Sequence, residues 1–280
     1  MWTQFCTALP FEWAQYSFMQ NALLAALLLA PLFALPGCLV VNNRMAFFSD
    51  AIGHAALTGV AIGALAGIAA PLPSMLIFAC CLAFVISYMR RVSAVPADTV
   101  ISLVMAGSMA LGIVILSRKG GFGRYSRYLI GDLLSLSTTD LYVIAFTLLF
   151  VIAAWLFMFN RFFLVSFNET IARSRNVNVF GYDLFFSVMI AFIVTLAVQW
   201  IGILVINSLL ILPAAAARNI SANLRTYILT ALFISLISSI TGLVLSFYLA
   251  AAAGATIVLV ALGFYILSLF GRILVNYKSA

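Results

Sequence analysis

The stretch FFSDAIGHAALTG, residues 47–59, opens an apolar run that continues to about residue 70. A run of this length can cross a membrane as a helix, which takes roughly 20 residues. The stretch also holds Asp50 and His54, the only histidine of the chain, four residues apart. It therefore predicts a membrane-spanning helix that carries two ionisable side chains on one face.

The composition of the whole chain favours the same environment. Of its 280 residues, 66% are hydrophobic and 8% are charged, whereas soluble domains carry roughly 25% charged residues. In lipid, only helices and closed barrels satisfy every backbone group. The apolar runs here are long and do not alternate, which is typical of helices. We therefore predict an all-α fold, a polytopic membrane helical bundle, formed by residues 1–280 as a single transmembrane domain.

Eight long apolar runs set the expected number of membrane spans. They lie near residues 17–41, 47–70, 72–92, 97–117, 137–160, 183–203, 226–250 and 256–275. A ninth run, LVINSLLILPAAAA at 204–217, is short and is bounded by Pro213 and then Arg218. We expect it to form a half-length crossing or a re-entrant helix, which is tolerated where protein shields it from lipid.

Two polar segments, 117–140 and 160–183, interrupt the apolar pattern and contain many of the basic residues. If 160–183 is cytoplasmic and the short run crosses, ten of the 14 basic residues lie on the cytoplasmic side. By the positive-inside rule, the N-terminus is then outside and the C-terminus inside. The net charge of +7 is thus a topology signal, and we expect membrane lipid rather than nucleic acid as a partner.

The external segment is basic, against this bias. It carries Arg118, Lys119, Arg124 and Arg127, followed by YLIGDLLSLS, which we expect to form a short surface helix. Opposite charges steer the encounter of two proteins. We therefore expect segment 117–140 to have a function of its own, such as receiving a partner of opposite charge.

Asp50 and His54 are residue types that bind transition metals, and imidazole suits zinc well. Ionisable groups within a membrane span often mark a transport pathway. The alternative is structural: Ser49 or Asp50 caps the helix, and His54 bonds a neighbouring carbonyl. The same helix carries small residues at every fourth position (Ala55, Gly59, Gly63 and Gly67), which favours close packing inside a bundle.

The cytoplasmic segment contains NETIARSRNVNV, residues 168–179. Its pattern predicts an amphipathic helix of one or two turns at the membrane surface, ended by Asn176 in a left-handed conformation. Either this is a solvated loop, or Glu169, Ala172 and Arg173 form a docking element for another protein.

Five stretches, taken together, resemble the metal-uptake ABC permease family, the zinc and manganese importers. They are SDAIGHAALTGVAIG, VPADTVISLVMAGSMALGIVILS, YLIGDLLSLSTTDL, IGILVINSLLILPAAAAR and AGATIVLVALGFYILSLF. They follow the order of the family and cover nearly the whole chain, and the third looks closest to the zinc-uptake members. The chain departs from the family pattern at Thr58, where proline is frequent, at Asn176, where glycine is frequent, and in the alanines before Gly254.

The resemblance implies a permease subunit in the bacterial cytoplasmic (inner) membrane, not an enzyme, with no permanently bound cofactor. Zinc or manganese would be its transported substrate. Asp50 and His54 would be metal ligands on the path. Glu169, Ala172, Arg173 and Asn176 would form the coupling helix that fits an ABC ATPase subunit. The permease would be a homodimer served by an extracytoplasmic metal-binding protein, whose carboxylates would dock on Arg118, Lys119, Arg124 and Arg127.

Other functions remain open on the residues alone. A manganese or iron importer of the same family would share these motifs. An ion-coupled secondary transporter would need carboxylates inside its spans, and Asp50 is the best candidate. A metalloprotease of the H-E-x-x-H type needs two histidines, and this chain has one. The phosphate-binding motif G-x-x-x-x-G-K-[ST] is also absent from the sequence. ATP, if used, must be hydrolysed by a separate subunit.

Overall fold

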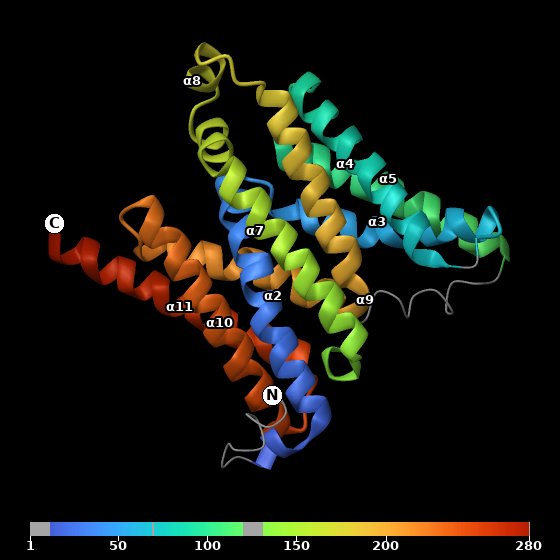
Figure 1. The fold of residues 1–280 in the computed structure, drawn as a ribbon. Helices are drawn as coiled ribbons and strands as arrows, with labels where there is room; N and C mark the ends of the chain where they lie inside the picture. Colours follow the sequence, from blue (N-terminus) through green and yellow to red (C-terminus); the bar gives the residue numbers. More distant parts are fainter. Residues whose placement is uncertain (1–11, 69, 120–130, 280) are drawn as a thin grey trace. The chain divides into compact units, whose positions relative to one another are not determined.

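The computed structural model describes residues 12–68, 70–119 and 131–279, and every regular element in these ranges is a helix. In chain order the elements are η1 (Glu12–Gln15), α2 (Ser17–Asn42), α3 (Ala46–Leu65), α4 (Pro71–Val92), α5 (Ala97–Lys119), η3 (Leu133–Ser135), α7 (Thr138–Phe167), α8 (Glu169–Ser174), α9 (Val179–Ile220), α10 (Leu224–Leu249) and α11 (Ala253–Ser279) (Figure 1). The all-α fold predicted from the sequence is confirmed.

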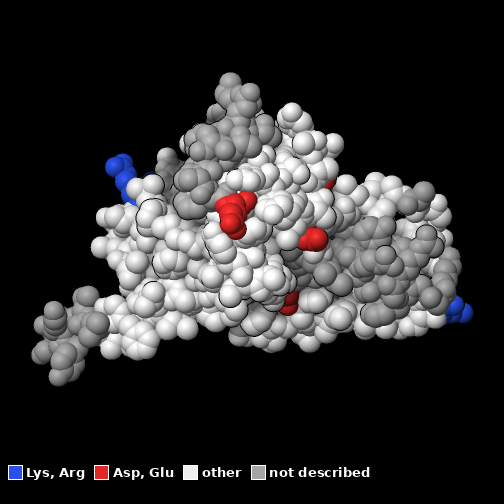
Figure 2. Space-filling view, turned by 90° about the horizontal axis from the view of Figure 1, so that it is seen from below, with Lys and Arg blue, Asp and Glu red and all other residues white. Residues whose placement is uncertain are grey.

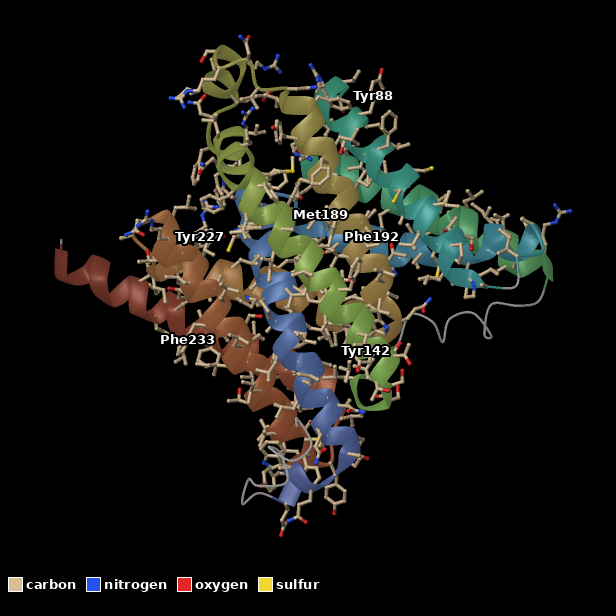
Figure 3. All side chains as sticks on the ribbon, in the orientation of Figure 1. Tyr88, Tyr142, Met189, Phe192, Tyr227 and Phe233 are labelled. Carbon is tan, nitrogen blue, oxygen red and sulfur yellow. The ribbon has the colours of Figure 1, made fainter. Side chains whose placement is uncertain are left out.

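Eight of these helices are long and apolar enough to span a membrane, as predicted. Their outward surfaces suit lipid. Large side chains such as those of Tyr88, Tyr142 and Phe233 point away from the helices and are exposed (Figure 3). Figure 2 shows one face on which most side chains are uncharged, with acidic residues in small patches and basic residues at the rim. An exposed surface this poor in charge is stable in a bilayer and not in water.

Helix α9 is broken in its interior at Gly202, where φ is 73° and ψ is 164°. At about 1.5 Å per residue, its 42 residues would be about 63 Å long if straight, twice the thickness of the hydrocarbon core. The break separates the long run that was predicted to end near residue 203 from the short run 204–217. The short run is longer than expected, because the helix continues through Pro213 to Ile220. Intramembrane helices tolerate proline when neighbouring groups replace its missing hydrogen bond.

The chain divides into two compact units. Unit 1 comprises residues 1–38, 132–155 and 207–280, and unit 2 comprises residues 39–131 and 156–206. Helices α2, α7 and α9 run from one unit into the other.

Unit 1 is held together by close helix packing and by hydrogen bonds to backbone carbonyls. A methyl group built at Gly242 of α10 would lie 2.5 Å from the Cα of Ile257 of α11, so only glycine allows this approach. The Tyr227 hydroxyl donates to the Cys38 carbonyl at 3.2 Å. The cap of α10 is a reciprocal pair of bonds between Asn223 and Thr226, which fixes where this helix begins.

In unit 2, α3 packs along both α4 and α5 (Figure 1). Thirteen of its 20 residues are buried. Helix α4 begins with Pro71 at its first position and ends with Arg90 and Arg91 in its last turn. Proline suits the first position, because an N–H group there would have no partner within the helix. The two arginines suit the last turn, because cations stabilise the negative end of the helix dipole.

Two polar segments differ from their predicted form. Helix α7 continues to Phe167 instead of ending near residue 160, because Asn160 and Arg161 are followed by the apolar residues 162–165. In the described part of segment 117–140, the predicted surface helix is only the single turn η3. There Asp132 Oδ1 accepts a hydrogen bond from the Leu134 amide at 3.0 Å.

Candidate functional site: an intramembrane Asp–His pair and a surface helix

The sequence-predicted pair Asp50 and His54 lies on one face of α3, and the structure brings the two side chains together. His54 Nε2 is 3.5 Å from Asp50 Oδ1, and the side chains of His54 and Asp50 are 34% and 31% exposed. Two ligand atoms that are each about 2.1 Å from a tetrahedral zinc ion lie about 3.4 Å apart. The observed separation therefore suits two ligands of one ion without movement of the backbone.

The alternative explanation of Asp50 as a helix cap does not hold. The N-cap of α3 is Met45, and its side chain makes no capping hydrogen bond. Ser49 Oγ is buried and has no hydrogen-bond partner within the described residues. Asp50 follows one turn into the helix, where a carboxylate has no capping role.

The pair is a sparse site. No group of three or more His, Cys, Asp or Glu side chains that could hold a metal occurs in the described part of the chain. A closed structural zinc site needs about four protein ligands. Asp50 and His54 would thus leave positions for water, backbone oxygens or a second chain, and a weak site of this kind lets an ion leave again.

Small residues fix α3 firmly in unit 2. A side-chain carbon at Gly59 would lie 2.7 Å from the Met75 Cα of α4. The Thr58 hydroxyl donates to the Ser108 carbonyl of α5 at 2.6 Å. The predicted close packing is confirmed at Gly59, but Gly67 takes no part in it. It follows the helix in a left-handed conformation, with φ of 73° and open space around it.

The sequence predicted that one apolar run ends near residue 203, but not that the break in α9 lies against α3. A side-chain carbon at Gly53 would be 3.0 Å from Ile203 Cγ1, directly after the break at Gly202. Breaks in intramembrane helices often line ion sites, because they expose polar backbone groups. The glycine between two apolar runs was the available signal in the sequence.

The predicted surface helix is present as α8. Asn168 caps it by accepting a hydrogen bond from the Ile171 amide at 3.0 Å. Asn176 follows with φ of 54°, which confirms its predicted left-handed conformation. Arg173 pairs with Glu169, and both are exposed.

One predicted docking residue lies on the wrong side of α8. Ala172 is fully buried, whereas Ile171 is 44% exposed. The side chain of this buried alanine is not accessible to a partner. A helix of six residues has too few positions for the sequence pattern to show which apolar residue faces inward.

The four basic residues expected to dock a binding protein are only partly visible. Arg118 is exposed near the end of α5. Lys119 is the last residue of that helix, but its side chain is not described. Arg124 and Arg127 lie outside the described residues.

A family model of the ABC 3 transport family matches residues 15–272. The chain belongs to this family. Among its relatives within the ABC 3 transport family is the high-affinity zinc uptake system membrane protein ZnuB of Haemophilus influenzae. It is 29% identical over 256 residues, which cover 90% of this chain and 96% of that protein. The manganese transport system membrane protein MntC of Halalkalibacterium halodurans is 31% identical, covering 91% and 87%.

A solved structure shares the fold of this ABC 3 family chain. PsaBC from Streptococcus pneumoniae, solved in complex with a Fab, is 27% identical, with a TM-score of 0.77 over 91% of each chain. The resemblance to the metal-uptake ABC permeases is thereby confirmed. The named relatives include zinc and manganese systems, so the comparisons do not separate the two metals.

Proposed function

We propose that this chain is the membrane-spanning permease subunit of an importer that moves a divalent transition metal, most simply zinc, into the cytoplasm. The observation that carries the proposal is the Asp50–His54 pair. It is a metal-type ligand pair at a spacing that suits one ion, on a helix buried in the membrane-spanning part of unit 2. Family membership supports the same function.

The energy source in this proposal is ATP hydrolysed by a separate subunit, because the chain has no phosphate-binding motif of its own. That ATPase docks on α8 through Glu169, Arg173 and the turn at Asn176. The whole chain acts as one transmembrane permease domain in a bacterial cytoplasmic membrane, as a homodimer, with the N-terminus outside. An extracytoplasmic metal-binding protein delivers the ion to the basic segment at 117–140. The chain holds no permanent cofactor, and the metal is its substrate.

Manganese is the second candidate substrate, since several relatives are named for it. Zinc favours nitrogen and sulfur ligands, whereas manganese favours carboxylates, carbonyls and water. The single imidazole of His54 therefore supports zinc, and the scarcity of further nitrogen or sulfur ligands weakens that preference.

The test of the function is growth rescue under metal depletion. Cells that lack their own zinc and manganese importers would express the chain with its ATPase and binding protein. Rescue by zinc alone supports the proposal, rescue by manganese alone transfers it to the second candidate, and rescue without the ATPase refutes the ABC mechanism. Uptake that a proton ionophore abolishes while ATP is kept constant would instead indicate an ion-coupled secondary transporter.

A further inference from the structure

A polar cavity of about 500 Å³ lies in unit 2 beside α8. This volume falls within the roughly 300–1,000 Å³ of small-molecule pockets. Its wall combines the ends of five helices, α2, α4, α7, α8 and α9, and it includes four arginines and two carboxylates: Arg44, Arg90, Arg91, Arg173, Glu169 and Asp183. We call it the α8 cavity. Glu169 and Arg173 also belong to the proposed docking surface of α8, whereas the other lining residues belong neither to that surface nor to the Asp50–His54 pair.

The charges on the wall of the α8 cavity do not balance. Four arginines face two carboxylates, and each carboxylate already has an arginine partner: Arg90 with Asp183 at 3.4 Å, and Arg173 with Glu169. Within the described residues, neither Arg44 nor Arg91 has an ion pair. The cavity thus has a surplus of two positive charges.

Hydrogen-bond donors also exceed acceptors on this wall. Arg90 Nη1 donates to Met45 Sδ at 3.0 Å and approaches Asp183, while its Nε is buried with no partner among the described groups. The hydroxyl of Ser87 is buried in the same way. Arg91 holds its guanidinium over the ring of Phe180, 5.3 Å from the centroid, which leaves the edge of its planar fork for an acceptor.

The position of the cavity indicates where an anion would come from. Its wall is built from the last turn of α4 and the first turns of α9, where membrane spans end and lipid head groups lie. On α4, Tyr88 is 53% exposed and points away from unit 2 (Figure 3), as aromatic residues do at the head-group level. Basic pockets between the ends of membrane spans suit anionic head groups.

We infer that the α8 cavity binds the phosphate of an anionic phospholipid head group, with Arg44 and Arg91 as its principal partners. A phosphodiester supplies the charge and the acceptor oxygens that the wall lacks. A metal cation on its way out would meet a net positive wall and is disfavoured. The site is separate from the Asp50–His54 pair, so its failure would leave the proposed transport function untouched.

The experiment uses the full chain in nanodiscs of phosphatidylcholine with and without phosphatidylglycerol, followed by native mass spectrometry to count retained lipids. The double variant Arg44→Gln, Arg91→Gln should bind phosphatidylglycerol on the order of 30-fold more weakly, since each basic residue near the surface contributes roughly a factor of five. The lysine pair Arg44→Lys, Arg91→Lys keeps the charge and should retain most of the binding. This second variant separates charge from any folding defect.

The matched control is Arg161→Gln, Arg175→Gln, which removes the same charge from unit 2 outside the α8 cavity. Equal loss in the control and the cavity variant would overturn the inference, because it would indicate general electrostatic attraction. Displacement of the lipid by inorganic phosphate alone would identify a free-phosphate site and overturn the lipid source. If the cavity variant keeps its lipid and instead loses the co-purifying ATPase, the cavity is a protein-docking surface and the inference is wrong.

Discussion

Asp50→Asn is the sharpest test of the metal path, because it removes one charge and leaves the shape of the side chain almost unchanged. Its structural cost is small. The pair spans four residues on a helix and is about a third exposed, and such pairs stabilise a helix by roughly 0.2–0.5 kcal/mol. The variant should therefore insert and fold as the parent does.

The effect on the bound ion is much larger. Two unit charges 4 Å apart interact by about 4 kcal/mol at an effective dielectric constant of about 20. A divalent ion doubles this value, and water at a site that is a third exposed reduces it. A net loss of about 3 kcal/mol remains, which corresponds to roughly a 100-fold decrease in affinity.

The assay is uptake of radioactive zinc by proteoliposomes that contain the permease, its ATPase and ATP. We expect Asp50→Asn and His54→Ala each to lower uptake by about 100-fold or more at low zinc, with unchanged expression and ATPase association. Asp98→Asn is the matched control, because it makes the same Asp-to-Asn change in the first turn of α5. This variant should transport zinc at the normal rate. A normal uptake rate in Asp50→Asn would refute our reading of the pair.

Three further predictions test the α8 docking surface, the packing of α3 and the basic segment at 117–140. Glu169→Lys places a repelling charge beside Arg173 on α8 and should abolish co-purification of the ATPase while the permease still inserts; unchanged co-purification would exclude this surface. Thr58→Val removes the bond to the Ser108 carbonyl and should lower stability by about 1 kcal/mol, measured as a decrease in the thermal midpoint in detergent; an unchanged midpoint would show that the bond contributes nothing. Arg118→Glu should slow association of the extracytoplasmic binding protein at low salt and much less at high salt, as measured by surface plasmon resonance, and salt-independent binding would contradict it.

The membrane spans could be predicted because the bilayer imposes their length. Any apolar run of about 20 residues must be a helix there, so composition alone located eight of them. The ends were harder. Helix α7 continues over residues 160–167, because Arg161 at the membrane surface can extend its charged end towards water. Helix α9 continues through Pro213 because a backbone group in lipid has no water to bond to, so the chain stays helical on both sides of the proline.

The Asp50–His54 pair was predictable because it is local. Residues four apart on one helix meet whatever the tertiary structure is. The burial of Ala172 and the α8 cavity were not, since both depend on contacts between segments far apart in sequence. Arg44 and Arg91 are 47 positions apart, and only the folded unit shows that they share a wall. The sequence alone does not show which arginines form ion pairs with carboxylates from distant segments.

The contacts of unit 2 also bear on how an event at α8 could reach the metal pair. Arg90 joins Asp183 in the first turns of α9 to the sulfur of Met45, the residue that caps α3. Asp50 lies five residues further along α3, a helix that α4 and α5 hold in tight contact. Because close-packed helices move as bodies and do not deform gradually, a shift of Arg90 would displace the start of α3 and the pair with it. Glu169 and Arg173 of α8 line the same cavity as Arg90. We therefore expect an ATPase or a phosphate bound at this cavity to act on Arg90, one of the groups that connect α3 to α9.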